Sequence, residues 1–182
     1  MLYLVECGFA DSSQATAWND WYSGLKLEEL LTLPDFLSAQ RFRALDNNLA
    51  PYLNVTSIAS TELFTNPDYR RGGGGSFGPW ALDLIIDWRR LLFAGMDEMP
   101  AVADDQRLLV LDQEPDTASD LGVAMTWLDG LDWQTATNYA DGVALAASVP
   151  HRGLAIVSPE IADALPPLPS LRIYTPICPK RV

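Results

Sequence analysis

The chain has very few of the side chains on which recognisable catalytic and metal sites most often depend. Its 182 residues include a single histidine, His151, and two cysteines, Cys7 and Cys178. One histidine argues against a histidine-rich metal centre, a histidine-ligated haem and a serine–histidine–aspartate triad. His151 lies in a Pro-His-Arg-Gly sequence, which predicts an exposed turn. We therefore expect no metal ion and no cofactor.

Two cysteines are too few for a disulfide scaffold, and their separation does not match the spacing of metal ligands. Cys7 falls within an apolar run, where cysteine usually acts as a small hydrophobic side chain rather than as a nucleophile. Reduced thiols are the default state in the cytosol. The sequence therefore predicts a cytoplasmic protein.

Basic residues are scarce as well, because 12 Lys and Arg stand against 24 Asp and Glu, for a net charge of −12. Such a field repels a nucleic-acid backbone, and no basic stripe compensates for it. No apolar run reaches the roughly 20 residues that a membrane span needs. The apolar run that begins at Leu2 has no basic leader before it. The expected partner is a small-molecule substrate, not a nucleic acid or a membrane.

Nucleotide-binding fingerprints are also missing. The four glycines at residues 72–75 superficially resemble a phosphate loop, but no Gly-Lys-Ser/Thr sequence follows them and no strand leads into them. Their loop is either a plain flexible connection or a lid over a pocket mouth, because mobile loops often gate sites. In the second case Tyr69, Arg70 and Trp80 would contact the ligand.

What the sequence does contain is a hydrophobic fraction of 48%, enough for a packed core. Residues 2–5 form a short apolar run that is typical of a buried strand. A helix follows, with Ser12 or Ser13 as its cap. It carries an aromatic stripe through Trp18 and Tyr22 at helical spacing, and it ends before Pro34. Residues 36–45 then resume a strand pattern.

The remaining residues predict a second half that repeats the element order of the first. Strands are expected at residues 52–58, 82–93, 107–113, 143–149, 154–157 and 171–177, although a helix at 82–93 also fits. Short helices are expected at residues 61–67, 124–131 and 160–165. The acidic, proline-interrupted segment at residues 96–105 reads as a linker.

The first half resembles the dimeric α+β barrel superfamily, and within it the EthD-like proteins. The resemblance covers roughly residues 1–100 and is carried by Trp18, Trp21, Tyr22, Leu31, Pro34, Phe36, Gln40, Arg41 and Phe42. It implies a ferredoxin-like βαββαβ unit whose sheet pairs with a second sheet around a ligand cavity. Its members include cofactor-free isomerases, polyketide cyclases and small monooxygenases. Many of them carry a histidine in the first helix, where this chain has Leu25 and Lys26.

The expected fold class is therefore α+β, with tandem ferredoxin-like βαββαβ units at residues 1–98 and 106–182 that together form one α+β barrel. In this arrangement one chain supplies both sheets that two subunits supply elsewhere. A homodimer in which the first halves pair between chains stays open as the alternative.

The candidate site consists of polar and aromatic residues of the first half. An arginine in an apolar pocket can hold a carboxylate or enolate, and a tyrosine can donate to a developing oxyanion or shuttle a proton. We assign Tyr22, Arg41 and Tyr69 as catalytic residues. The expected substrate-binding residues are Asn19, Gln40, Arg43, Tyr52, Asn54, Arg70 and Trp80.

These groups suit a cofactor-free lyase or isomerase acting on an aromatic or carbonyl/carboxylate metabolite. A non-catalytic ligand-binding or accessory protein is one alternative, favoured by the missing histidine. A cofactor-free monooxygenase is another.

Overall fold

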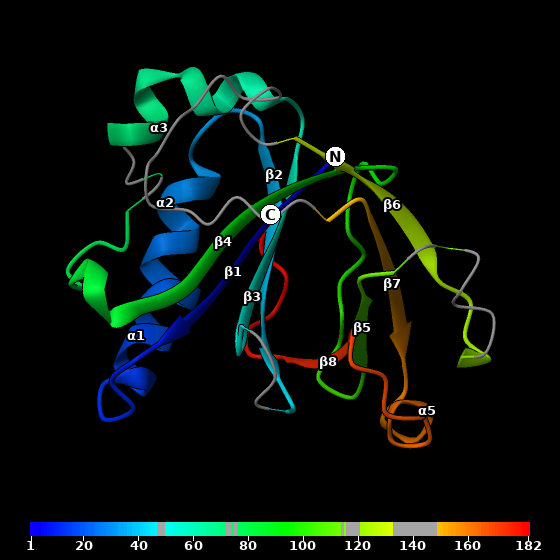
Figure 1. Cartoon of the computed structure of the whole chain (residues 1–182). Helices are drawn as coiled ribbons and strands as arrows, with labels where there is room; N and C mark the ends of the chain where they lie inside the picture. Colours follow the sequence, from blue (N-terminus) through cyan, green and yellow to red (C-terminus); the bar gives the residue numbers. More distant parts are fainter. Residues whose placement is uncertain (47–49, 72–73, 75, 114, 116–120, 133–148) are drawn as a thin grey trace.

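The computed structural model describes residues 1–46, 50–71, 74, 76–113, 115, 121–132 and 149–182, with the backbone alone at residue 70. Eight strands form one closed antiparallel barrel (Figure 1). The strands are β1 (Leu2–Phe9), β2 (Phe36–Ala44), β3 (Tyr52–Ile58), β4 (Ile85–Ala94), β5 (Arg107–Leu111), β6 (Thr126–Leu131), β7 (His151–Val157) and β8 (Leu171–Pro176).

The order of strands around the barrel is β1-β3-β2-β8-β5-β7-β6-β4, so each half of the chain contributes four adjacent strands in the same relative order. Two pairings join the halves. β2 pairs with β8 between Phe42–Ala44 and Tyr174–Pro176, and β4 pairs with β6 between Leu92–Ala94 and Asp129–Leu131. Closure removes every sheet edge among these strands.

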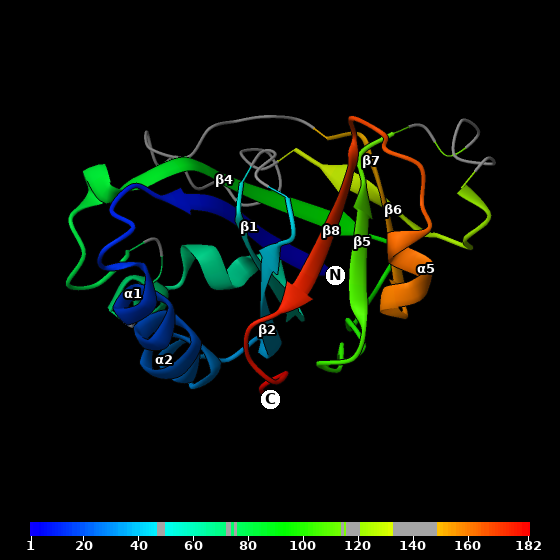
Figure 2. The same cartoon turned by 90° about the horizontal axis from the view of Figure 1, so that it is seen from below.

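Helices are short and lie outside the barrel. One uninterrupted helical run consists of α1 (Ala15–Trp21), the π-helical segment η1 (Tyr22–Lys26) and α2 (Leu27–Leu31), and it covers the outer face of the first-half strands (Figure 2). The other segments are the 3₁₀ turn η2 (Thr61–Thr65), α3 (Pro67–Arg71), the 3₁₀ turn η3 (Leu82–Leu84) and α5 (Pro159–Asp163).

Strand β1 is buried on both faces because it separates two cores. Leu2 and Leu4 point into the barrel and belong to the cluster that fills it, with Phe42, Leu53 and Phe93 among its members. The intervening side chains point outward, where the aromatic stripe of the helix covers them in a second cluster. A strand alternates polar and apolar residues only when one face meets water, so the sequence of β1 begins with a continuous apolar run.

The segment between β4 and β5 is not a free spacer. Met99 and Val102 are buried in the cluster that fills the barrel. The side-chain amide of Gln40 donates to the carbonyl oxygen of Val102 (2.8 Å) and accepts from its backbone amide (3.0 Å). The Ser57 hydroxyl accepts from the backbone amide of Met99 (3.0 Å). These contacts fasten the segment to the barrel.

The fold class and the keywords drawn from it were wrong. In place of an α+β structure with tandem ferredoxin-like units, the described residues form one closed antiparallel β-barrel with only short helices. The helix expected at residues 124–131 is strand β6, because its backbone pairs with both β4 and β7. Pairing with strands distant in the sequence outweighs a local pattern that fits either element.

Several local expectations also met a clear outcome. The strand at residues 52–58 is confirmed as β3, and most of residues 82–93 form strand β4. The prediction of a serine cap for the first helix was wrong, because Gln14 occupies the N-cap position and its side chain makes no capping hydrogen bond. The Pro-His-Arg-Gly sequence is not an exposed turn, since His151 begins β7 and Arg152 is fully buried.

The strand expected at residues 143–149 falls almost entirely outside the described residues. Within the described part of the chain, no helix is both long and apolar enough to cross a membrane.

Candidate functional site

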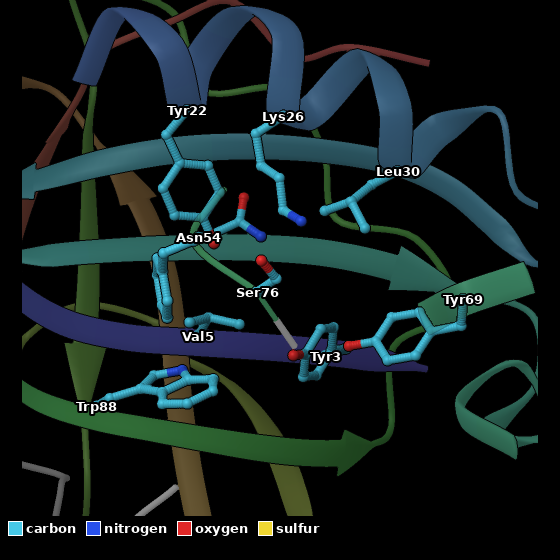
Figure 3. A pocket seen from close by; sticks show the side chains of 10 residues that line it. Tyr3, Val5, Tyr22, Lys26, Leu30, Asn54, Tyr69, Ser76 and Trp88 are labelled. Atoms are coloured by element: carbon cyan, nitrogen blue, oxygen red, sulfur yellow. The ribbon is translucent and has the colours of Figure 1, made fainter. Parts of the chain in front are cut away.

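A cavity lies between the helical run and the outer face of β1, β3 and β4 (Figure 3). Ten residues line it: Tyr3, Val5, Tyr22, Lys26, Leu30, Asn54, Tyr69, Ser76, Phe77 and Trp88. Its empty volume is about 350 Å³ including the part open to solvent, of which about 20 Å³ can hold the centre of a water molecule. Because so little of this space is free of neighbouring atoms, the cavity fits a ligand of only a few heavy atoms.

Lys26 is the unusual member of this lining. It extends from the π-helical segment toward the sheet (Figure 3), and only 4% of its surface is exposed. Burial lowers the pKa of its ammonium group from 10.5 to about 8, although the nearby charge of Glu29 opposes the change. Near neutral pH the ammonium form still prevails, but the neutral amine, whose lone pair is available for chemistry, is far more abundant than in an exposed lysine.

Tyr22 lies four residues before Lys26 and points into the same cavity. The two residues begin and end the π-helical segment, an irregularity that occurs often at functional sites. Burial raises the pKa of the Tyr22 phenol above its ordinary value of 10, with only partial opposition from the charge of Arg41. Tyr22 therefore stays protonated and can act as a hydrogen-bond donor, not as a base.

Two further phenols are held by one arginine. The buried guanidinium of Arg90 donates from Nε to the Tyr3 hydroxyl (2.9 Å) and from Nη2 to the Tyr69 hydroxyl (2.7 Å). A guanidinium has no acceptor, so both phenols accept from Arg90 and direct their own hydrogens elsewhere. A positive charge behind two phenols makes them stronger donors toward a developing oxyanion.

Two lining residues carry buried polar atoms that have no hydrogen-bond partner among the described residues. Asn54 is 3% exposed; its amide nitrogen donates to the Thr56 hydroxyl (2.9 Å), while its oxygen accepts from nothing described. The indole nitrogen of Trp88 likewise has no described acceptor. Each such atom costs roughly 1–3 kcal/mol when buried. A ligand or a water molecule in the cavity would remove that cost.

The structure brings three predicted site residues to the cavity, namely Tyr22, Asn54 and Tyr69. Arg41 is buried behind Tyr22, with its guanidinium carbon 4.1 Å from the centre of the Tyr22 ring. It donates to the Asn19 carbonyl (3.1 Å) and side-chain oxygen (2.9 Å), and to the Ser23 hydroxyl (2.9 Å). Arg41 and Asn19 thus fasten the helix to β2 and support the wall of the cavity.

The other predicted binding residues lie elsewhere. Gln40 points into the barrel, as described above, and Arg43 is exposed. Tyr52 packs against Trp18, and Trp80 packs against Phe9. The side chain of Arg70 lies outside the described residues.

Sequence reasoning missed Lys26, Tyr3, Trp88 and Ser76. Lys26 had one signal, its position four residues after Tyr22 on the same helix, where the two side chains share a face. Tyr3 and Trp88 gave no signal, because each sits in a strand whose apolar pattern fits ordinary core packing.

A second polar cluster lies inside the barrel. Glu6 is fully buried and contacts Arg152 (2.8 Å), Arg172 (2.9 Å) and Arg89 (3.2 Å). Asp112 accepts from Arg152 and Arg172 at 2.6 Å each. Burial alone would raise the pKa of Glu6, but the three arginines outweigh burial and hold it below 4.5. The contacts run between strands of both halves of the chain, so the cluster joins the two halves of the barrel.

No cluster of three or more His, Cys, Asp or Glu side chains in the described part of the chain is placed to hold a metal ion. Comparison with known proteins adds no assignment: no family model, no curated protein and no solved structure gives a significant match.

Proposed function

We propose that the protein is a cofactor-free lyase or isomerase that acts on a small carbonyl compound in the cavity beneath the helical run. The observation that carries the proposal is the buried amine of Lys26 in a cavity that also holds phenol donors and unpartnered polar atoms. Clefts that combine a strongly perturbed titratable group with convergent polar groups are the usual location of active sites.

The chemistry follows from what each group offers. Lyase and isomerase reactions of carbonyl compounds pass through a carbanion next to the carbonyl carbon, with negative charge on its oxygen. The phenols of Tyr3 and Tyr69, backed by Arg90, can stabilise that oxygen. Lys26 supplies the lone pair that the reaction needs, and the rings of Phe77 and Trp88 exclude water.

The test follows the exchange of protons next to a carbonyl group. The protein would be incubated in D2O with propanal or acetone, and loss of the α-proton signal would be followed by NMR. We expect exchange that is faster than in buffer and that saturates with probe concentration. It should be lost in Lys26→Met and kept in Lys180→Met, which removes the other lysine of the chain. Unchanged exchange in Lys26→Met would refute the proposal.

A non-catalytic binding protein is the second candidate. It is favoured by the lining itself, because none of the ten lining residues is a carboxylate or a histidine that could relay protons. It predicts saturable binding of the same probes without α-proton exchange.

We also place the protein in the cytoplasm. Cys7 and Cys178 are both free and buried, which fits a reducing compartment.

A further inference from the structure

The chain has two lysines, and the fold places them in opposite environments. Lys26 is buried in the cavity, whereas Lys180 follows β8 and forms an ion pair with Glu98 at the surface. With the amino group of Met1, the protein has three amines in all. Lys26 is the one that lines the cavity beneath the helical run.

We propose that Lys26 is a covalent attachment point, whose amine condenses with the carbonyl group of a small aldehyde or ketone to form a Schiff base. This inference rests on the proposed function and narrows its substrate class, since esters and free acids do not form such an adduct under mild conditions. It also assigns to Lys26 the role of nucleophile in place of general base.

The step balances without a redox partner. The nitrogen lone pair forms a bond to the carbonyl carbon, and the carbonyl oxygen takes up a proton to give a carbinolamine. That hydroxyl group then leaves as water after it receives a second proton, and the nitrogen lone pair forms the C=N bond of a protonated imine. The nitrogen gives up one of its two hydrogens as a proton when the carbinolamine forms and keeps the other in the protonated imine, so that the amine, the carbonyl compound and one proton give the protonated imine and water.

The groups around Lys26 suit each stage. Phenols at Tyr3, Tyr22 and Tyr69 line the cavity and can donate to the carbonyl oxygen. The Asn54 side-chain oxygen, which has no donor among the described residues, is a ready acceptor for the N–H of a protonated imine.

Burial, not charge, lowers the pKa of the Lys26 amine. The titratable groups that face the cavity with Lys26 are the three phenols, with Arg90 behind two of them. The charge of Glu29, which is exposed on α2, opposes this effect of burial. An amine in apolar surroundings with no carboxylate in its cavity is the environment in which lysine becomes a nucleophile.

The cavity walls also limit the substrate. Val5, Leu30, Phe77 and Trp88 present apolar surface, and the enclosed space is small. The favoured carbonyl compound is therefore a short aldehyde or ketone with an apolar remainder, without a charged phosphate or a long chain.

The wild-type protein itself allows the decisive experiment. Propanal and sodium cyanoborohydride would be added at pH 8, where the cyanoborohydride reduces any imine to a stable secondary amine. Intact mass and peptide mapping would then follow labelling at Met1, Lys26 and Lys180 over time. Lys26 should react on the order of tenfold or more faster than Lys180, whose ammonium group pairs with Glu98. Its rate should saturate with propanal concentration, while labelling at the surface amines should rise linearly.

Two variants check the assignment. Lys26→Met should retain only the slow, linear labelling, with its fold verified by circular dichroism, and Lys180→Met should keep the fast, saturable site. Labelling of Lys26 that is slower than that of Lys180, or that does not saturate, would overturn the inference. If the wild-type protein nevertheless catalyses α-proton exchange, the proposed function still holds, with Lys26 acting as a general base. Fast labelling without exchange would instead uphold the Schiff base and refute the lyase or isomerase.

Discussion

Replacing Lys26 by methionine should make the protein more stable near neutral pH. Methionine keeps the unbranched shape of the side chain and removes a buried ammonium group. A fall of the Lys26 pKa from 10.5 to about 8 corresponds to roughly 3 kcal/mol of free energy, at about 1.4 kcal/mol per pKa unit. That is the cost that the folded state bears for holding the charge, and the variant does not bear it.

The pH dependence gives the sign of the effect. Between pH 8 and 10.5 the unfolded chain still holds the Lys26 proton that the folded chain has lost, so unfolding takes up a proton. Rising pH therefore disfavours unfolding of the wild type across this window. The advantage of Lys26→Met should be full below pH 8 and should shrink by about 3 kcal/mol by pH 10.5.

Urea denaturation at several pH values between 7 and 10.5 measures this difference directly. The comparison between the two proteins cancels every other group that titrates in the same range. Lys180→Met is the matched control, and it should not reproduce the pH-dependent gain because Lys180 pairs with an exposed carboxylate. Parallel stability profiles for wild type and Lys26→Met would show that Lys26 does not lie in apolar surroundings, and the candidate site would lose its basis.

Three further predictions concern the fold. Glu6→Gln should lower the free energy of unfolding by roughly 3–5 kcal/mol in urea denaturation, because it removes the buried carboxylate that Arg152 and Arg172 share. A loss under about 1 kcal/mol would show that the cluster does not stabilise the fold. Gly24→Ala should stabilise the helical run by about 0.5–1 kcal/mol, since nothing lies within 4 Å of the added carbon. Gly130→Ala should destabilise the protein, because the added carbon would lie 1.9 Å from the Val149 carbonyl oxygen. Midpoints of thermal unfolding equal to that of the wild type would contradict both expectations. Burial raises the pKa of the Cys7 thiol to about 12, so it should resist Ellman's reagent at pH 8 until urea is added.

The stability prediction and the proposed chemistry have one physical cause. Burial increases the fraction of Lys26 that is a neutral, reactive amine, and the same burial makes its charged form unfavourable in the folded state. Residues of this kind persist where function requires them, at a cost in stability.

The sequence by itself determined most of the local structure of the first half. The apolar run at residues 2–5 lies in strand β1, the alternating pattern at residues 52–58 is strand β3, and the stripe through Trp18 and Tyr22 lies on the helical run. These features are local, because propensity and periodicity act over a few consecutive residues.

Only the tertiary structure decided how the elements combine. Closure of the barrel depends on β2 meeting β8 and β4 meeting β6, and no local pattern specifies a partner strand so distant in the sequence. The same is true of the two polar clusters. Arg152 is buried because Glu6 and Asp112 meet it inside the barrel. Lys26 became the centre of the candidate site because the outer face of β1, β3 and β4 closes beneath it. A charge is buried or exposed according to what surrounds it, and those surroundings come from distant parts of the chain.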